Sequence, residues 1–242
     1  MNADTKDLIL NAFYPAKCLF CDDSLSPDSL FWLCDDCRNN MPKLVDPTCP
    51  NCSGVMKQNG LYRRCETCGE SKKTYLLNID YFKYANNAHD AVLRLKYSNA
   101  VDHAKPMAEL MLANMKNAKI KTKFDIVVPM PISKNRLKQR GYNQSEFLAK
   151  QIAKNLDLPV DTKSLLKIKE TPPQTTLTER EREKNLKEAF GVFENNLENK
   201  KVLLVDDVST TGTSINEASD CILKQGKAKS VNAIVFALTD NE

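Results

Sequence analysis

The chain has 242 residues, of which 42% are hydrophobic and 27% are charged, with 35 basic and 31 acidic side chains. This composition excludes a disordered protein, because it supplies enough apolar residues for a core, and no apolar run approaches the roughly 18 residues that a membrane span needs. The net charge of +4 is mild and by itself points to no class of partner. The length suits one medium domain, or a large domain joined to a small one.

The N-terminal stretch lacks the pattern of a secretory signal, because its apolar run is short, interrupted and preceded by two aspartates. We therefore expect a cytoplasmic protein, in a compartment that keeps thiols reduced and disfavours a disulfide framework. Eight of the nine cysteines precede residue 70. Metal ligation is the natural explanation for so many cysteines in a reducing compartment.

These cysteines form an internal repeat of four Cys-x-x-Cys pairs. Twelve residues separate the two pairs in each half, and every cysteine of the second half lies 31 positions after its counterpart in the first. One Cys-x-x-Cys turn points two thiolates at a common point, and two turns supply the tetrahedral set that zinc prefers. The equal spacing favours sequential pairing over interleaved pairing. The ligands expected for two zinc ions are Cys18, Cys21, Cys34 and Cys37, followed by Cys49, Cys52, Cys65 and Cys68.

We expect these two zinc ions to be structural. Apolar periodicity is poor in residues 1–78, and structural zinc contributes about 10–16 kcal/mol of apparent binding free energy that can replace a core. Four thiolates leave no position for a water, which argues against catalytic zinc. Redox-active pairs and simple core cysteines are the alternatives, and the regular spacing disfavours both. Whether such ribbons bind nucleic acid, bind protein or only stiffen the chain stays open.

The chain divides near residue 78. Residues 1–78 carry 9 basic and 10 acidic side chains, whereas residues 79–242 carry 26 and 21. The small part, predicted to be a double zinc-ribbon domain, is therefore a poor candidate for the main nucleic-acid surface. The basic excess lies in the larger part, which we predict to be a separate α/β domain.

Strand and helix patterns alternate through this larger part. Strands are expected at 79–84, 125–130, 190–193, 201–205 and 231–239, helices at 86–98, around 107–115, at 143–155 and at 213–225, and a polar loop at 169–185. The alternation predicts a parallel sheet with helices on both faces. Because ligands of such sheets bind beyond the carboxyl ends of the strands, we expect a site after Val128 and Val205.

A basic segment, ISKNRLKQRGYNQ, occupies residues 132–144. Basic side chains neutralise phosphates and an aromatic ring offers a stacking surface, a combination that suits single-stranded nucleic acid. A solvated basic helix edge is the alternative. The candidate DNA-binding residues are Arg136, Lys138, Arg140 and Tyr142. Tyr84 and Tyr97 could also stack a base, although packing explains them equally well.

The sharpest motif is VLLVDDVSTTGTS at residues 202–214. Its apolar residues form a buried strand that delivers Asp206 and Asp207 to the carboxyl edge of the sheet. The small hydroxyl residues around Gly212 lead directly into a helix, so backbone N–H groups, hydroxyls and the helix N-terminus can converge on a phosphate. Two carboxylates beside such a cradle suit the vicinal hydroxyls of a sugar, which predicts a ribose 5-phosphate site. A solvated acidic pair followed by a helix cap is the alternative.

This motif resembles the signature of the type I phosphoribosyltransferases. The resemblance implies that the acidic pair holds the ribose hydroxyls of phosphoribosyl pyrophosphate (PRPP), with Mg²⁺ bridging ribose and pyrophosphate. The implied PRPP-binding residues are Asp206, Asp207, Val208, Ser209, Thr210, Thr211, Gly212, Thr213 and Ser214. The implied pyrophosphate loop follows the earlier strand and consists of Pro131, Ile132, Ser133 and Lys134.

Over nearly its full length, the chain also resembles the ComF/ComFC competence family. The resemblance rests on the FYPAKCLFC opening, the cysteine pairs, LKY at 95–97, PMPISKNRLKQRGYNQ, QTTLTEREREKNLKEAF at 174–190 and VLLVDDVSTTGTS. It implies a cytosolic protein that assists the uptake of single-stranded DNA in natural transformation, with a DNA-translocating helicase and DNA-loading proteins as partners. Glutamates interleave the basic residues at 179–184, so we do not expect that loop to be the main DNA contact.

The sequence thus predicts a competence factor that handles single-stranded DNA and retains a PRPP site. The alternative is an active phosphoribosyltransferase that transfers phosphoribosyl to an unknown base or amine. No catalytic base is evident, which decides little, since such enzymes act by positioning and electrostatics. An interaction scaffold stabilised by its ligand is a third interpretation.

Overall fold

The structure, a computed structural model, describes residues 16–26, 32–42, 78–79, 82–97, 101–117, 123–169, 189–210 and 212–239. The four ligands predicted for a second zinc ion, Thr211 and nearly all of the predicted loop at 169–185 lie outside the described residues. No helix in the described part of the chain is long and apolar enough to cross a membrane.

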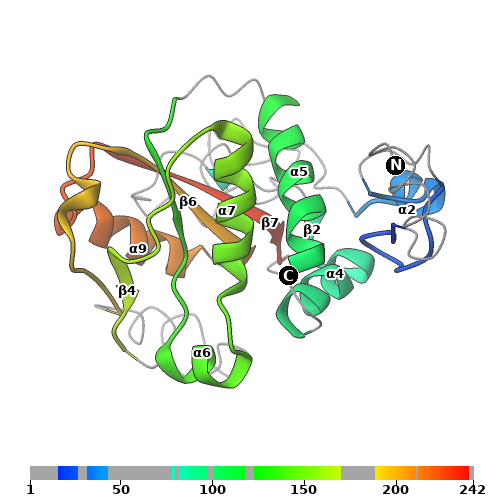
Figure 1. Ribbon diagram of the computed structural model, residues 1–242, viewed down its shortest axis with the longest axis horizontal. Coiled ribbons are helices and arrows are strands. Elements are labelled where there is room, and N and C mark those ends of the chain that lie inside the picture. Colours follow the sequence, from blue (N-terminus) through cyan, green and yellow to red (C-terminus); the bar gives the residue numbers. More distant parts are fainter. Residues whose placement is uncertain are drawn as a thin grey trace, which may run out of the picture.

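A parallel sheet forms the centre of the fold (Figure 1). Its strands run in the order β1 (Asn78–Ile79), β7 (Ser230–Leu238), β6 (Lys201–Ser209) and β3 (Ile126–Pro129), and β2 (Phe82–Lys83) also pairs with β7. Every pairing in this sheet is parallel. The long strands β6 and β7 are buried along most of their length, as the near-continuous apolar runs predicted.

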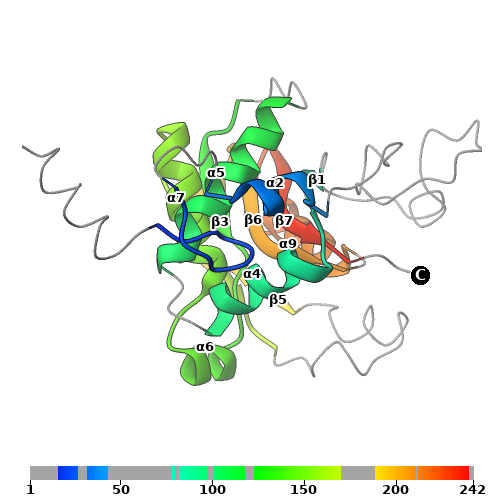
Figure 2. The ribbon, with the colours of Figure 1, turned by 90° about the vertical axis from the view of Figure 1, so that its right-hand side faces the viewer.

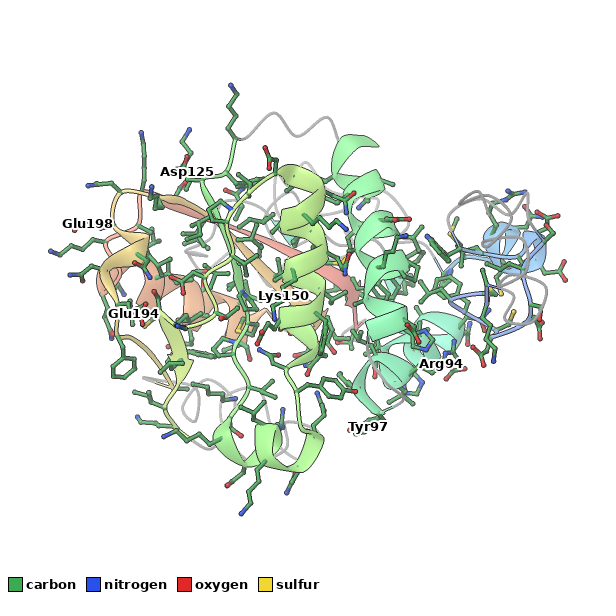
Figure 3. The ribbon with its side chains drawn as sticks, viewed as in Figure 1. Arg94, Tyr97, Asp125, Lys150, Glu194 and Glu198 are labelled. Carbon is green, nitrogen blue, oxygen red and sulfur yellow. The ribbon has the colours of Figure 1, made fainter. Side chains whose placement is uncertain are left out.

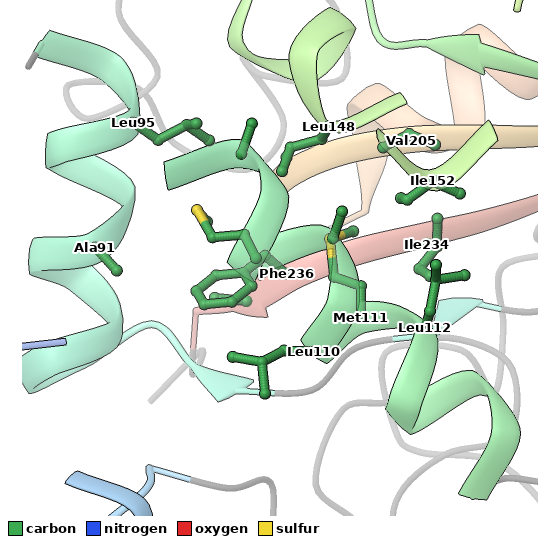
Figure 4. Close-up of a cluster of buried hydrophobic side chains, with 14 of the residues drawn as sticks. Ala91, Leu95, Leu110, Met111, Leu112, Leu148, Ile152, Val205, Ile234 and Phe236 are labelled. Carbon is green, nitrogen blue, oxygen red and sulfur yellow. The ribbon is translucent and has the colours of Figure 1, made fainter. Parts of the chain in front are cut away.

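Helices cover both faces, which confirms the predicted α/β class. The first face packs against α4 (Asn86–Tyr97), α5 (Val101–Asn117) and α7 (Gln144–Leu156), and the second against α9 (Thr213–Lys224). Figure 4 shows the first cluster, where Leu148 and Ile152 of α7 meet Val205 of β6. In α9 the aligned residues Ile215, Ala218 and Ile222 are buried as expected.

The predicted strand at 190–193 is real but belongs to a different sheet. β5 (Phe190–Val192) pairs antiparallel with β4 (Leu165–Lys167), a strand that the sequence pattern did not indicate. Three residues with one buried side chain are too few to produce a recognisable alternation. Asp161 shapes the turn into β4 by accepting hydrogen bonds from the N–H groups of Lys163 and Ser164, each at 2.9 Å.

A second correction concerns β6, which continues to Ser209 instead of ending at Val205. The reason is its neighbour β7, which runs alongside so that Asp206 pairs with Val235 and Ser209 with Leu238. On the other side β3 stops, with Pro129 opposite Val205. The acidic pair is therefore part of a strand that has lost one of its two neighbours.

The N-terminal segments at 16–26 and 32–42 pack onto α4, α5 and the end of β7. Figure 2 shows α2 (Asp35–Asn39) and the adjoining blue loop in front of these helices. Phe20 is buried, with its ring centroid 5.2 Å from that of Phe82 and 6.5 Å from that of Phe236. Arg94 of α4 donates to the carbonyl oxygens of Leu19 and Phe20 at 2.7 and 2.6 Å. One core joins the two parts, and the predicted domain division at residue 78 stays a prediction.

Candidate functional site

The acidic pair lies at the carboxyl end of the sheet, where β3 has ended and β6 continues. The Met130 N–H group donates to the Val205 carbonyl at 2.8 Å, just beyond the last paired residues of the two strands. Beyond this point β3 offers no partner to β6. Side chains from the helices above the sheet can therefore reach Asp206 and Asp207.

Asp207 is buried, 4% exposed, and forms an ion pair with a lysine from α4. Its Oδ2 lies 2.9 Å from Lys96 Nζ, and its Oδ1 accepts from Gln144 Nε2 at 3.5 Å. Burial opposes ionisation of this carboxyl, but the Lys96 ammonium and hydrogen bonds from neighbouring side chains together hold the pKa of Asp207 below its ordinary value. Burial also opposes protonation of Lys96, but the nearby acidic groups, with Asp207 contributing most, together raise the pKa of Lys96. The pair is charged at neutral pH.

Asp206 is held differently. Its Oδ1 accepts from Ser145 Oγ at 2.8 Å and from the Asp207 N–H group at 2.9 Å. Burial, reinforced by the charge of Asp207, raises the pKa of Asp206 well above its ordinary value. The two neighbouring carboxyl groups thus divide their roles, because one is ionised and compensated while the other favours its neutral form.

The segment after the acidic pair leads into α9 through a left-handed glycine. Gly212 has φ 74° and serves as the N-cap of α9, so the helix starts without a side-chain cap. Ser209 is buried, and its hydroxyl has no hydrogen-bond partner within the described ranges. Thr213 and Ser214 form the first turn of α9. The chain therefore passes from the acidic strand into the N-terminus of a helix whose first turn carries hydroxyl residues, a succession of groups that suits a phosphate.

The predicted pyrophosphate loop lies after β3, at the same edge of the sheet. Ser133 is the buried N-cap of α6 (Lys134–Arg140) and accepts from the Arg136 N–H group at 3.4 Å. Asn143 donates to the Met130 carbonyl at 3.0 Å and connects the start of this loop to the start of α7. The structure therefore places Pro131–Lys134 beside the acidic strand, as expected from the order of β3 and β6.

The basic side chains predicted to bind DNA lie on and just after α6. Arg136 and Lys138 are exposed, whereas Arg140 is half-buried and donates to Gln144 Oε1. Lys134, from the predicted pyrophosphate loop, is exposed beside them. Tyr142 is half-buried, its hydroxyl donates to the Leu95 carbonyl at 3.0 Å, and its ring meets Phe147 edge-on. These contacts give Tyr142 a packing role. The exposed members of the predicted DNA-binding set are therefore Arg136 and Lys138.

Three residues of the acidic site were not predicted, namely Lys96, Gln144 and Ser145. The family resemblance included Lys96 in LKY and Gln144 at the end of the RGYNQ stretch, but nothing in the sequence connected them to the acidic pair. A lysine after the last apolar residue of an amphipathic helix ordinarily indicates a solvated helix end. Only the packing of α4 and α7 over the end of β6 gives these polar groups their partners.

The first predicted set of zinc ligands is assembled. The Sγ atoms of Cys18, Cys21, Cys34 and Cys37 all lie within 4.8 Å of one another. The N–H groups of Cys34 and Cys37 donate to cysteine sulfurs at 3.4 Å, and Asn87 of α4 donates to Cys37 Sγ at 3.6 Å. Four thiolates with N–H donors around them fit a structural zinc ion.

Comparison with known families matches both parts of the chain. Residues 9–70 match the double zinc ribbon domain, and residues 143–242 match the phosphoribosyl transferase domain. The ribbon match and the four-cysteine cluster together indicate zinc. Among solved structures, adenine phosphoribosyltransferase from Saccharomyces cerevisiae aligns with 57% of this chain and 68% of its own, at 15% identity and a TM-score of 0.35.

Curated relatives extend over most of the chain. Competence protein F of Haemophilus influenzae is 27% identical over 219 residues, which cover 88% of this chain and 93% of that protein. Competence protein ComFC of Bacillus subtilis is 27% identical over 232 residues, 90% of this chain and 93% of its own. The DNA utilization protein YhgH of Escherichia coli is 27% identical over 183 residues, which cover 74% of this chain and 79% of that protein. With these relatives and with a double zinc ribbon ahead of a phosphoribosyl transferase domain, the chain belongs to the ComF/ComFC family of competence and DNA utilization proteins.

Proposed function

We propose that this protein is a DNA-uptake factor that handles single-stranded DNA in the cytosol and retains a binding site for PRPP or another ribose 5-phosphate. The observation that carries the proposal is the acidic pair at the end of β6, followed at once by a hydroxyl-rich turn into α9. Sugar hydroxyls would meet the carboxylates, and the 5-phosphate would meet the N–H and hydroxyl groups of residues 209–214.

The charge balance of the site supports an anionic ligand. Lys96 compensates the charge of Asp207, and Ser145 Oγ and the Asp207 N–H group donate hydrogen bonds to Asp206. These partners reduce the repulsion that a phosphate would meet at the end of β6. The loop Pro131–Lys134 would receive the pyrophosphate. Bound Mg²⁺ would supply charge compensation between ribose and pyrophosphate.

The decisive experiment for this site is titration calorimetry with PRPP and Mg²⁺. Wild type should bind, and Asp206→Ala/Asp207→Ala should bind at least about tenfold more weakly, since each charge-assisted hydrogen bond contributes about 1.5–3 kcal/mol. Asp125→Asn is a matched control, because Asp125 contacts the opposite end of β6 by accepting from the Lys201 N–H group at 2.7 Å. Absence of binding to wild type, or equal binding by the double variant, would refute the site.

The DNA part of the proposal is supported by the exposed cations of α6, which lie at the same edge of the sheet as the acidic pair. Binding to single-stranded DNA should weaken with salt, because each neutralised phosphate releases a counterion. Arg136→Ala/Lys138→Ala/Arg140→Ala should remove most of the affinity.

The control Lys224→Gln/Lys227→Gln/Lys229→Gln neutralises three exposed lysines at the amino-terminal edge of the sheet and should leave DNA binding intact. No binding by wild type at low salt, or equal loss in both triple variants, would refute a DNA surface on α6. By family resemblance, a DNA-translocating helicase and DNA-loading proteins are the proposed partners.

An active phosphoribosyltransferase is the second candidate, favoured by the match of residues 143–242 to the phosphoribosyl transferase domain. The same site would then position PRPP for attack by a base or an amine. Release of pyrophosphate from PRPP in the presence of one member of a nucleobase and amine panel would establish this activity. Absence of release with a PRPP-binding wild type would favour the DNA-handling role.

A further inference from the structure

The end of α4 presents an exposed aromatic ring beside the acidic site. Tyr97 is the last residue of α4 and is 72% exposed, the highest value among the large hydrophobic side chains in the described segments. The guanidinium carbon of Arg140 lies 5.2 Å from the centroid of the Tyr97 ring. Figure 3 shows Tyr97 at the lower end of α4, while Arg94 lies on the side that faces the N-terminal segment.

Neighbouring contacts hold this ring and this guanidinium in place. Lys96, the residue before Tyr97, is anchored by Asp207, and Arg140 is anchored by Gln144. The Tyr142 hydroxyl joins the end of α4 to the start of α7 through the Leu95 carbonyl. These contacts restrain the helix ends that carry Tyr97 and Arg140 before any ligand arrives, which lowers the entropy cost of binding.

The other aromatic side chains near this edge have packing partners that cover them. Tyr142 meets Phe147 edge-on with ring centroids 5.6 Å apart, and Tyr84 lies edge-on to His89 at 5.0 Å. Among the described aromatic residues at this edge, Tyr97 is therefore the ring with an open face. It lies next to α6, whose Lys134, Arg136 and Lys138 are exposed. An open ring beside a row of cations is the combination by which proteins hold single-stranded nucleic acid.

We propose that Tyr97 and Arg140 form a stacking site for one base of single-stranded DNA, with the DNA backbone running along the cations of α6. The inference rests on the proposed DNA-handling function and names the residues that contact a base. The base lies on the open face of the Tyr97 ring, and the guanidinium of Arg140 supports the ring from the other side. Through Lys96 and Gln144 this stacking site is joined to Asp207, so DNA and the sugar phosphate meet at adjacent positions.

The test compares a fluorescein-labelled oligothymidine with an abasic oligonucleotide of the same length by fluorescence anisotropy. Tyr97→Ala should weaken oligothymidine binding roughly 5- to 150-fold, the range that stacking on an aromatic side chain supplies, and should leave abasic binding unchanged. Tyr97→Trp and Tyr97→Phe should retain the affinity. The salt dependence should be the same in Tyr97→Ala and wild type, because no phosphate contact is lost.

Phe193→Ala is the matched control, because Phe193 is 64% exposed and lies in the region of the β4–β5 sheet instead of at the acidic edge. It should bind both oligonucleotides as wild type does. Unchanged oligothymidine binding by Tyr97→Ala overturns the stacking site and leaves the proposed function standing. Equal weakening for both oligonucleotides also overturns it, since Tyr97 would then act through the fold. Failure of wild type to bind either oligonucleotide removes the DNA-handling proposal and this inference with it.

Discussion

Helix α4 contacts two polar clusters that are built in different ways. Near its start, Asn87 donates to Cys37 Sγ of a cysteine cluster whose members all lie between residues 18 and 37. At its end, Lys96 pairs with Asp207 in a cluster assembled from residues far apart in the sequence. The first cluster is local and takes its geometry from two short turns. The second exists only when α4, α7 and β6 are all in place, so it reports on the packing of the whole domain.

Removal of the metal from the cysteine cluster should produce the largest effect on stability. A strong chelator, or Cys18→Ser, should release the N-terminal segments from α4, because structural zinc contributes about 10 kcal/mol or more to folding of such units. Thermal unfolding should shift to a much lower temperature, and protease digestion should begin near residues 16–42. If the acidic cluster depends on α4 as a rigid link, PRPP binding should weaken as well. Unchanged thermal unfolding in the zinc-free protein would contradict a structural role for the metal.

Breaking the Lys96–Asp207 pair should have the next largest effect. Asp207→Asn leaves the Lys96 ammonium without its counter-ion and should lower the free energy of unfolding at neutral pH by about 3 kcal/mol, the lower end of the range for broken buried pairs, because the Lys96 side chain remains 20% exposed. The double variant Lys96→Met/Asp207→Asn should recover part of this loss. Urea denaturation of the four members of the cycle measures the coupling. Additive effects would show that the two side chains do not interact.

The neighbouring carboxyl should respond with the opposite sign. The folded pKa of Asp206 is raised, so protonated Asp206 stabilises the folded state. This contribution is fully present below the ordinary pKa of 3.8 and is lost as the pH rises through the raised pKa. Asp206→Asn removes the cost of ionising this buried carboxyl. It should therefore increase the free energy of unfolding at pH 7 to 8, by less than Asp207→Asn decreases it. For Asp207 the folded pKa is lowered, and its contribution is lost as the pH falls through that value. Thermal unfolding followed from below pH 3.8, where the Asp207 contribution is lost, up to pH 8 would reveal the two trends. A destabilised Asp206→Asn at pH 8 would contradict the assignment.

The exposed cations of α6 should have the smallest effect on stability. Lys138 belongs to neither polar cluster, so Lys138→Ala should change the free energy of unfolding by no more than about 0.5 kcal/mol. If Lys138 contacts one phosphate, the same variant should reduce the slope of log K against log salt for single-stranded DNA by about 0.7. A large loss of stability would mean that α6 takes part in the fold more than its exposure indicates.

Several features could be predicted from the sequence because their physical cause is local. The spacing of the cysteine pairs places two thiolates on each turn, and the structure assembles the first set of four. Apolar periodicity identified the buried faces of α4, α7 and α9, and the apolar runs identified β6 and β7. The run of small hydroxyl residues around Gly212 indicated a turn into a helix, where the structure has a left-handed glycine.

Other features were decided by tertiary structure alone. Periodicity reports which side of an element is apolar, but it contains no information on which helix end meets which strand end. The meeting of Lys96 with Asp207, of Ser145 with Asp206 and of Arg140 with Tyr97 therefore had no signature in the sequence. Likewise, β6 continues past Val205 to Ser209 because it stays paired with β7. A strand persists for as long as a neighbour forms hydrogen bonds with its backbone N–H and C=O groups. The sequence alone thus determined the first cluster of four cysteines and the sheet that bears the acidic pair, whereas packing decided which partners hold that pair.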